Sequence, residues 1–439
     1  MFVFYLLAAV LLGILIMVHE LGHFFACKAV GVRVERFSIG FGPRVLKVQR
    51  GDTEYALSLI PLGGYVKMAG AEPAPDGEIP DLEPDAYLSK PVSKRAIIVA
   101  AGPLTNLLLG FVVTFLVLLV AGLPTLGEPI VGDVQPGSLA ELSGLAAGDR
   151  IERVDGELVE SWTDVQERFD ASGGSVVLVV DRDGRVATVE LDVVDPDGEQ
   201  AELGITPFVP AIVGDVMSGS PADLAGIESG DRFVRIDGRE VSSWYEVGDV
   251  IYERPDMETE VVWERDGETM SAVIVPDVGE EVFGDNDVRE VGLIGVMRQW
   301  DTERLPFTEA LATGLDLTKT YAVMLVQALG YAVSELVSGR VPSDVLGGPI
   351  RVVQMATESA RWGGSYFFGF MALLSVNLCV INLLPLPILD GGHLLLLLIE
   401  RIRGRSLSER ALLIWQQIGL VFFVSLTIAL LYMDIAKGA

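Results

Sequence analysis

This chain of 439 residues has little histidine, little cysteine and few positive charges. Its two cysteines, Cys27 and Cys379, lie in or beside apolar runs, so they provide no disulfide framework and are interpreted as small packing residues. Lys and Arg number 32 against 61 acidic residues, and this deficit argues against nucleic-acid binding. The three histidines are His19, His23 and His393, and all of them fall within two short motifs.

Charge is also absent from the whole of residues 2–18. About 17 residues at a rise of 1.5 Å nearly cross a hydrocarbon core of roughly 30 Å, so this run predicts a membrane span within residues 1–30. No Lys or Arg precedes the run and no small-x-small cleavage site follows it, which argues against a signal peptide. Further apolar runs predict three more spans, at 96–122, 366–399 and 411–433.

A fifth apolar stretch, Tyr321 to Val333, has only about 13 residues between charged flanks, which suits an interfacial or buried helix better than a crossing. Residues 297–365 are therefore predicted to hold interfacial helices. With four spans in total, His19, His23 and Asp390 would lie at similar depth. Counting the fifth stretch as a span would send Asp390 to the opposite face of the membrane.

Charge distribution predicts the orientation. Residues 122–310 contain 43 acidic residues, 13 Arg and no Lys, whereas the loops at 31–95 and 400–410 hold many Lys and Arg residues. By the positive-inside tendency, these two loops are cytoplasmic, while the acidic segment and both termini lie outside.

His19, Glu20 and His23 form a His-Glu-x-x-His motif at the end of the first apolar run. On a helix, positions i and i+4 share a face, so both imidazoles can hold one zinc ion, with Glu20 beside them as general base. Ionisable groups in a membrane are costly unless they pair or bind something, so the cluster is interpreted as functional. Zinc needs a third protein ligand, and both Asp390 and His393 qualify from the residues alone.

The acidic segment contains an internal repeat. The pattern that runs from Val131 to Trp162 returns 82 residues later, from Val213 to Trp244, without a gap. A repeat of this length is domain-sized, and alternating β-branched residues broken by Gly and Asp predict β-rich modules at 127–208 and 209–296. Their Gly-Ser-x-Ala, Gly-Asp and Asp-Gly steps resemble PDZ domains, which bind extended peptides by strand addition.

The third apolar run carries the second motif, which extends from Asn382 through Pro385 and Pro387 to Asp390-Gly391-Gly392. Together with His-Glu-x-x-His in the first span, it resembles the site-2 protease family of intramembrane zinc metalloproteases. The resemblance covers nearly the whole chain and includes the motifs Phe37–Gly42, Ile60–Met68, Ala101-Gly102-Pro103-x-x-Asn106 and Gly348-Pro349-Ile350. It implies a polytopic α-helical membrane protein with four transmembrane helices, two inserted β-rich PDZ domains and a membrane-associated β-hairpin.

The resemblance implies that His19, His23 and Asp390 bind Zn²⁺ and that Glu20 is the catalytic base, which leaves His393 as a residue that orients a ligand or packs beside it. Residues 53–68 are interpreted as two short strands around Pro61 that bind an unwound substrate by strand addition. The candidate substrate-binding residues are Gly63, Gly64, Tyr65, Asn377 and Asn382.

The resemblance also implies a substrate class. It predicts cleavage within the transmembrane segment of pre-trimmed single-pass proteins, namely an anti-sigma factor of an envelope stress response and remnant signal peptides. The expected location is a bacterial inner membrane, with the termini and the PDZ domains in the periplasm and zinc near the cytoplasmic side. The residues argue against two alternative functions. A non-catalytic PDZ sensor would have lost Glu20 or Asp390, and a metal transporter would need neither Glu20 beside His19 nor exported PDZ modules.

Overall fold

The computed structural model describes residues 2–71, 83–172, 174–192, 204–283, 287–340, 347–405 and 408–436. The chain divides into two compact units. One is formed by residues 1–121 together with 305–439 and is mainly helical, and the other is formed by residues 122–304 and is rich in β-strands.

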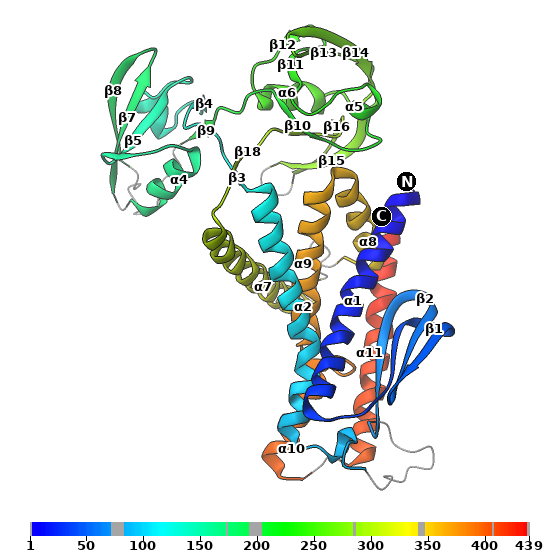
Figure 1. The fold of residues 1–439 in the computed structure, drawn as a ribbon. Coiled ribbons are helices and arrows are strands. Elements are labelled where there is room, and N and C mark those ends of the chain that lie inside the picture. The colour runs from blue at the N-terminus through cyan, green and yellow to red at the C-terminus, as the bar shows by residue number, and fades with distance from the viewer. Residues whose placement is uncertain are drawn as a thin grey trace. The chain divides into compact units, whose positions relative to one another are not determined.

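Four long helices of the helical unit are labelled in Figure 1, and the first three of them pack against one another. They are α1 (Phe2–Val30), α2 (Val92–Ala121), α9 (Gly364–Asn382) and α11 (Glu409–Ala436). Leu11 and Leu15 of α1 pack with Val113 of α2 and Met371 of α9 in a common core. The chain's two ends lie at one end of this bundle, and the short helix α10 (Asp390–Arg403) lies at the other (Figure 1).

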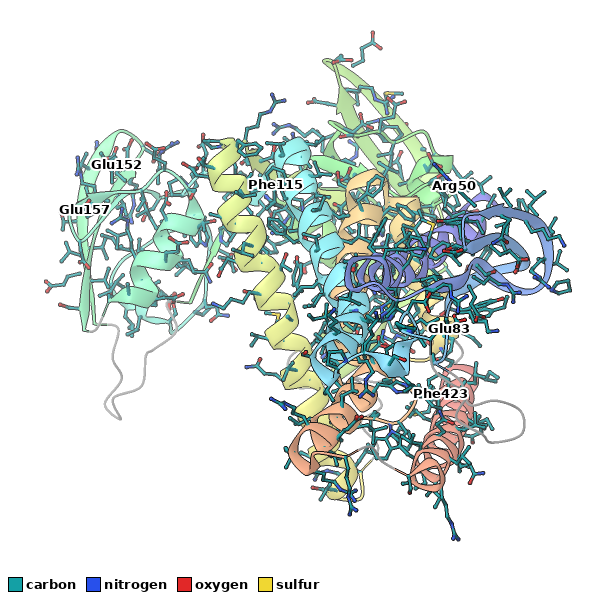
Figure 2. All side chains as sticks on the ribbon, turned by 60° about the horizontal axis from the view of Figure 1, so that its bottom comes forward. Arg50, Glu83, Phe115, Glu152, Glu157 and Phe423 are labelled. Atoms are coloured by element: carbon teal, nitrogen blue, oxygen red, sulfur yellow. The ribbon has the colours of Figure 1, made fainter. Side chains whose placement is uncertain are left out.

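Five helices among the described residues are long and apolar enough to cross a membrane, because α7 (Phe307–Val337) meets the same criteria as those four. It is far longer than the apolar stretch predicted from the sequence. Figure 1 shows α7 foreshortened, whereas α2 lies nearly in the plane of the picture. The axis of α7 therefore runs across the bundle rather than along it. The crossing lies at Phe115 (Figure 2), where Gly314 has no side chain and lets the two backbones approach closely. The chain then returns to the bundle through α8 (Pro349–Trp362).

The third apolar region, predicted as 366–399, is divided into two helices. Helix α9 ends at Asn382 and α10 begins at Asp390. Proline lacks a backbone N–H and fixes φ, so Pro385 and Pro387 cannot continue the helix. Ile388 adopts φ of 80°, which is a strained conformation for a β-branched residue. The break therefore places Asp390 at the first turn of a new helix.

A small sheet packs against α1. It is formed by β1 (Val34–Arg50) and β2 (Thr53–Met68), and Figure 2 labels Arg50 at the end of β1. The register pairs Phe37 with both Val66 and Tyr55, so the first part of β1 lies between the two halves of β2. The sequence predicted that these halves would form a hairpin with each other. Instead the two halves pair with opposite edges of the first part of β1, residues 34–39. A single 3-10 turn, Tyr87–Ser89, precedes α2.

The β-rich unit contains two modules with the same order of elements, as the sequence repeat predicted. The first consists of β4 (Val131–Val134), α3 (Leu139–Leu142), β5 (Arg150–Val154), β6 (Glu157–Leu158), α4 (Trp162–Ala171), β7 (Ser175–Arg182), β8 (Arg185–Asp192) and β9 (Ile205–Pro207). The second consists of β10 (Val213–Val216), α5 (Pro221–Leu224), β11 (Arg232–Ile236), β12 (Arg239–Glu240), α6 (Trp244–Tyr252), β13 (Thr259–Arg265), β14 (Glu268–Ile274) and β17 (Val296–Arg298). Each has a four-stranded sheet, of order β6-β5-β7-β8 and β12-β11-β13-β14.

The same stabilising contacts recur in both modules. Ser161 and Ser243 each cap the following helix in a reciprocal capping box. A buried carboxylate at Asp149 pairs with Arg182, and its counterpart Asp231 pairs with Arg265. The two modules are therefore copies of one fold.

In the second module, β17 pairs with β10 as β9 pairs with β4 in the first. Its chain also forms a hairpin of β15 (Asp277–Phe283) and β16 (Asp287–Leu293). Strands β3 (Leu123–Thr125) and β18 (Asp301–Glu303) pair with each other and bring the two ends of the β-rich unit together.

Candidate metal centre

Two helices bring three potential metal ligands to one point. His19 and His23 lie on one face of α1, and their Nε2 atoms are 3.1 Å apart. Asp390 is the first residue of α10, and its Oδ2 atom lies 3.1 Å from His19 Nε2 and 3.5 Å from His23 Nε2. The three side chains are largely buried, with exposed fractions of 13%, 9% and 17%.

This arrangement fits zinc. Tetrahedral zinc with bonds of about 2.0–2.1 Å holds its ligand atoms about 3.3–3.4 Å apart. The separations of 3.1, 3.1 and 3.5 Å lie around that value. Asp390 Oδ2 is also buried without a hydrogen-bond partner, and a buried carboxylate oxygen of this kind is best stabilised by a cation. Two imidazoles and a carboxylate are a common ligand set for catalytic zinc.

Helix α2 orients the imidazole of His23. His23 Nδ1 lies 2.8 Å from the carbonyl oxygen of Ile98, and a carbonyl can only accept a hydrogen bond. His23 therefore donates through Nδ1, and the neutral ring keeps a lone pair on Nε2. That lone pair is directed to the point shared with His19 and Asp390.

Helix α2 approaches the histidines closely because it has glycine at position 102. A Cβ atom built on Gly102 would lie 2.8 Å from His19 Nε2 and would overlap the ring of His23. On α1, a Cβ atom on Gly22 would overlap Thr105 and the backbone of Ala101. The two helices can therefore pack at this distance only without side chains at these positions.

A buried ion pair fixes the helix that bears Asp390. Arg95 at the start of α2 and Glu400 of α10 form two hydrogen bonds, of 2.6 and 3.1 Å, and their side chains are only 9% and 16% exposed. Gly391 and Gly392 have no side chains, so the carbonyl groups of the segment 383–389 can fold back against them. These contacts set the position of Asp390 relative to α2.

Glu20 faces the edge of the small sheet. Its carboxylate lies near the backbone N–H of Val66 on β2. A Cβ atom on Gly64 would lie 3.4 Å from Glu20 Cγ and 2.8 Å from the carbonyl oxygen of Ser38, so glycine lets the strand lie close to α1. Gly63 adopts φ of 116°, which favours glycine. The outer half of β2, residues 64–68, thus passes directly beside the His-Glu-x-x-His motif on α1.

The remaining residues predicted for the site lie as follows. Tyr65 follows Gly64 on the same strand, and its hydroxyl group lies 3.3 Å from Arg36 Nη1. Asn377 and Asn382 lie on the last turns of α9 and are half-buried. His393 is exposed, and the group of described ligand atoms within 4.8 Å of one another comprises only those of His19, His23 and Asp390.

Sequence reasoning missed the contribution of α2. Gly102 and Asn106 both face the histidines, and Arg95 holds α10. The available signal was the motif from Ala101 to Asn106, which places small and polar residues inside an apolar run. Such residues inside an apolar run indicate a helix that packs closely against another helix or against polar groups.

Comparisons of the whole chain with known proteins all point to one family. The model of peptidase family M50 matches residues 7–426. The chain is 35% identical to the regulator of sigma-E protease RseP of Salmonella typhimurium over 97% of both chains. It is 36% identical to the Escherichia coli protein of the same name, over 98% of this chain and 97% of that protein. A putative zinc metalloprotease of Neisseria meningitidis is 35% identical over 94% of this chain and 93% of its own length.

Among solved structures, a PDZ domain from the SdrC-like protein of Listeria monocytogenes matches 19% of this chain and 90% of its own length. The sequence identity is 22% and the TM-score is 0.16. A score this low places no constraint on the fold of either module.

Proposed function

This chain belongs to peptidase family M50, the site-2 proteases, and we propose that it uses Zn²⁺ held by His19, His23 and Asp390 to hydrolyse peptide bonds within the transmembrane segment of single-pass membrane proteins. It is a metalloprotease and an integral membrane protein. The observation that carries the proposed site is the convergence of the three ligand atoms at separations of 3.1–3.5 Å.

Glu20 is the proposed base. When bound, zinc polarises a water molecule and the scissile carbonyl group. Glu20 accepts the proton of the attacking water and delivers it to the nitrogen of the leaving amine. The strand β2 lies beside Glu20 at Gly64, and Asn106 of α2 lies beside His19, the residue before Glu20. His393 is exposed and takes no part in this chemistry, which favours Asp390 as the third ligand.

The outer half of β2 is the proposed substrate-binding strand. A transmembrane helix hides its amide groups in internal hydrogen bonds, so a substrate must unwind and find new partners before it is cut. Residues 64–66 pair with β1 on one side only among the described residues, and Gly64 lies beside Glu20. An extended substrate added to this edge would place its backbone next to the base. Gly63, Gly64 and Tyr65 would form that edge, with Asn377 and Asn382 as further partners for the substrate backbone.

We propose that four helices, α1, α2, α9 and α11, cross the membrane. Helix α7 runs across the bundle rather than along it, and the chain then returns to the bundle through α8. Both features favour an interfacial position for α7. The charge distribution then places the termini and the β-rich unit in the periplasm and the zinc site near the cytoplasmic side of a bacterial inner membrane.

The two β-rich modules are proposed to be PDZ domains that bind exported peptide segments. A cavity of about 490 Å³ is lined by α4 and β9 of the first module, including Val165 and Phe169, and also by Tyr245 and Arg298 of the second module. Strand addition beside a short helix is the mode in which PDZ domains bind peptides.

The relatives named as regulators of sigma-E protease support an anti-sigma factor as a substrate, and remnant signal peptides are proposed as a second class.

One experiment tests the core of this proposal. Purified full-length protein is incubated with single-pass model substrates, with and without a zinc chelator, and the products are mapped by mass. We expect cuts inside the apolar segment that stop with the chelator and return when zinc is restored. Cleavage that is insensitive to the chelator, or cuts confined to exposed loops, would contradict it.

A further inference from the structure

Asn106 lies fully buried in α2, beside the first histidine of the motif. Its side-chain nitrogen is 3.3 Å from His19 Nδ1. Its side-chain oxygen is buried without a hydrogen-bond partner, and the residue has an exposed fraction of 0%. An unsatisfied amide oxygen at this depth is unusual, because buried polar groups are nearly always paired.

The direction of this hydrogen bond follows from the chemistry of imidazole. If the amide nitrogen donated to His19 Nδ1, a neutral His19 would carry its proton on Nε2. That proton would point at Asp390 and His23, and Nε2 could not bind a metal. The oxygen and nitrogen of an amide have nearly the same shape, so a half-turn of the amide exchanges them without other movement. After the exchange, the Asn106 oxygen accepts from Nδ1–H and no longer lacks a partner.

We propose that Asn106 is a positioning residue of the metal site. Its side-chain oxygen accepts a hydrogen bond from His19 Nδ1–H and so keeps the lone pair of His19 Nε2 directed at the metal. This inference rests on the proposed role of His19 as a zinc ligand.

The backbone of Asn106 contacts α9, while its side chain faces α1. Its backbone oxygen accepts a hydrogen bond of 2.7 Å from the hydroxyl group of Ser375 on α9. The partner of the other histidine is also on α2, since His23 Nδ1 donates to the carbonyl oxygen of Ile98. Both imidazoles are therefore oriented by acceptors on one helix. The acceptor for His23 belongs to the backbone, so the acceptor for His19 is the one that a substitution can remove.

The test measures zinc affinity of the full-length protein in detergent, by competition with a chelator. Asn106→Leu has similar size and no acceptor, and we expect its affinity to fall by about 10- to 100-fold. Asn106→Asp retains an acceptor in the same place, as in the carboxylate–histidine–zinc arrangement, so its affinity should stay within a few-fold of the wild type. Asn106→Ala removes the acceptor without added bulk and replaces the Leu variant if that variant does not fold.

Ser375→Ala is the matched control. It removes a buried hydrogen bond to the same residue and leaves the amide group free to bind His19, so it should lower the thermal midpoint but not the zinc affinity. The thermal midpoint of each metal-free variant separates loss of folding from loss of positioning.

Two outcomes would overturn the inference while wild-type protein binds one zinc. They are an unchanged affinity in both the Leu and Ala variants, and an Asp variant as weak as the Leu variant. Failure of the wild type to bind zinc would instead overturn the proposed function of the whole site.

Discussion

A methyl group placed on Gly102 would lie 2.8 Å from Nε2 of His19, closer than unbonded carbon and nitrogen atoms approach. Helix α2 can therefore pass the metal ligands only because residue 102 has no side chain. The space that zinc would occupy is limited by a helix that provides no ligand.

Gly102→Ala should abolish stoichiometric zinc binding and proteolysis. The new methyl group overlaps the ring of His23 and forces it out of position. Zinc content measured by mass spectrometry of the purified protein tests this. Gly110→Ala is the matched control, because its methyl group would lie 2.7 Å from Val376 on α9, away from the ligands. The control should lose stability and keep its zinc, whereas normal zinc content in the Gly102 variant would refute the geometry.

Glu20→Gln should separate binding from chemistry. The substitution leaves both imidazoles and Asp390 in place, so zinc should remain bound near one equivalent. Removal of the base should lower the cleavage rate by about 10²–10⁴-fold. Zinc analysis and single-turnover cleavage of a model substrate provide the two measurements. Full activity in this variant would exclude Glu20 as the base.

Asp390→Asn and His393→Asn should differ sharply. The first replaces a carboxylate ligand with a weaker neutral donor and should lose both zinc affinity and activity. The second changes an exposed residue outside the ligand group and should cost at most about 10- to 100-fold. Chelator competition ranks the two variants. If His393→Asn proved the more damaging, His393 would replace Asp390 as the third ligand.

Arg182→Ala should weaken the first β-rich module locally. Asp149 is fully buried, and Arg182 donates two hydrogen bonds of 2.6 Å to its carboxylate. Loss of these bonds should reduce the local free energy of unfolding by about 1–3 kcal/mol, detected as faster hydrogen exchange in β5 and β7. Arg150→Ala is the control, because its pair with Glu128 is exposed and should contribute less than about 1 kcal/mol. Equal effects of the two variants would contradict the special role of the buried pair.

The same pair should make this module sensitive to acid. Burial alone would raise the pKa of Asp149, but the hydrogen bonds from Arg182 and from the Ala146 backbone lower that pKa below its usual range. The unfolded carboxyl group titrates near pH 3.9, so the stabilisation is complete above about pH 5 and is lost progressively as the pH falls below that. Hydrogen exchange measured down to pH 3 should show this loss in the wild type and a flatter response in Arg182→Ala.

Deletion of the β-rich modules should allow larger substrates to be cleaved and should leave peptide hydrolysis itself unchanged. Thr125 and Asp301 are register partners in β3 and β18, so residues 126–300 can be replaced by a short linker without separating the ends. In the proposed topology, the modules and the zinc lie on opposite sides of roughly 30 Å of bilayer core. The shortened protein should keep its zinc, cut a short pre-trimmed substrate, and also cut substrates that retain a bulky exported domain. A folded, zinc-loaded deletion variant that cannot cut the short substrate would show that the modules deliver or position the substrate instead.

Local patterns in the sequence determined much of this protein. The spacing of His19 and His23 sets both rings on one helical face, because a helix repeats every 3.6 residues. Pro385 and Pro387 end a helix just before Asp390 by removing backbone donors. The repeat that begins again at Val213 predicted two modules of the same fold. Each of these features depends on neighbours in the chain, so the sequence alone carries it.

Contacts between distant segments were decided only by the tertiary structure. The separation of His393 from the ligand group follows from the direction in which α10 leaves the helix break, and the Arg95–Glu400 ion pair fixes that direction. Both halves of β2 pair with residues 34–39 of β1, one along each edge, and strand periodicity does not reveal this choice. Asn106 meets His19 through the packing of α2 on α1. Such contacts produce no periodic pattern in the sequence of either helix. Close packing between helices depends on the shapes of both surfaces, and a single chain pattern specifies only one of them.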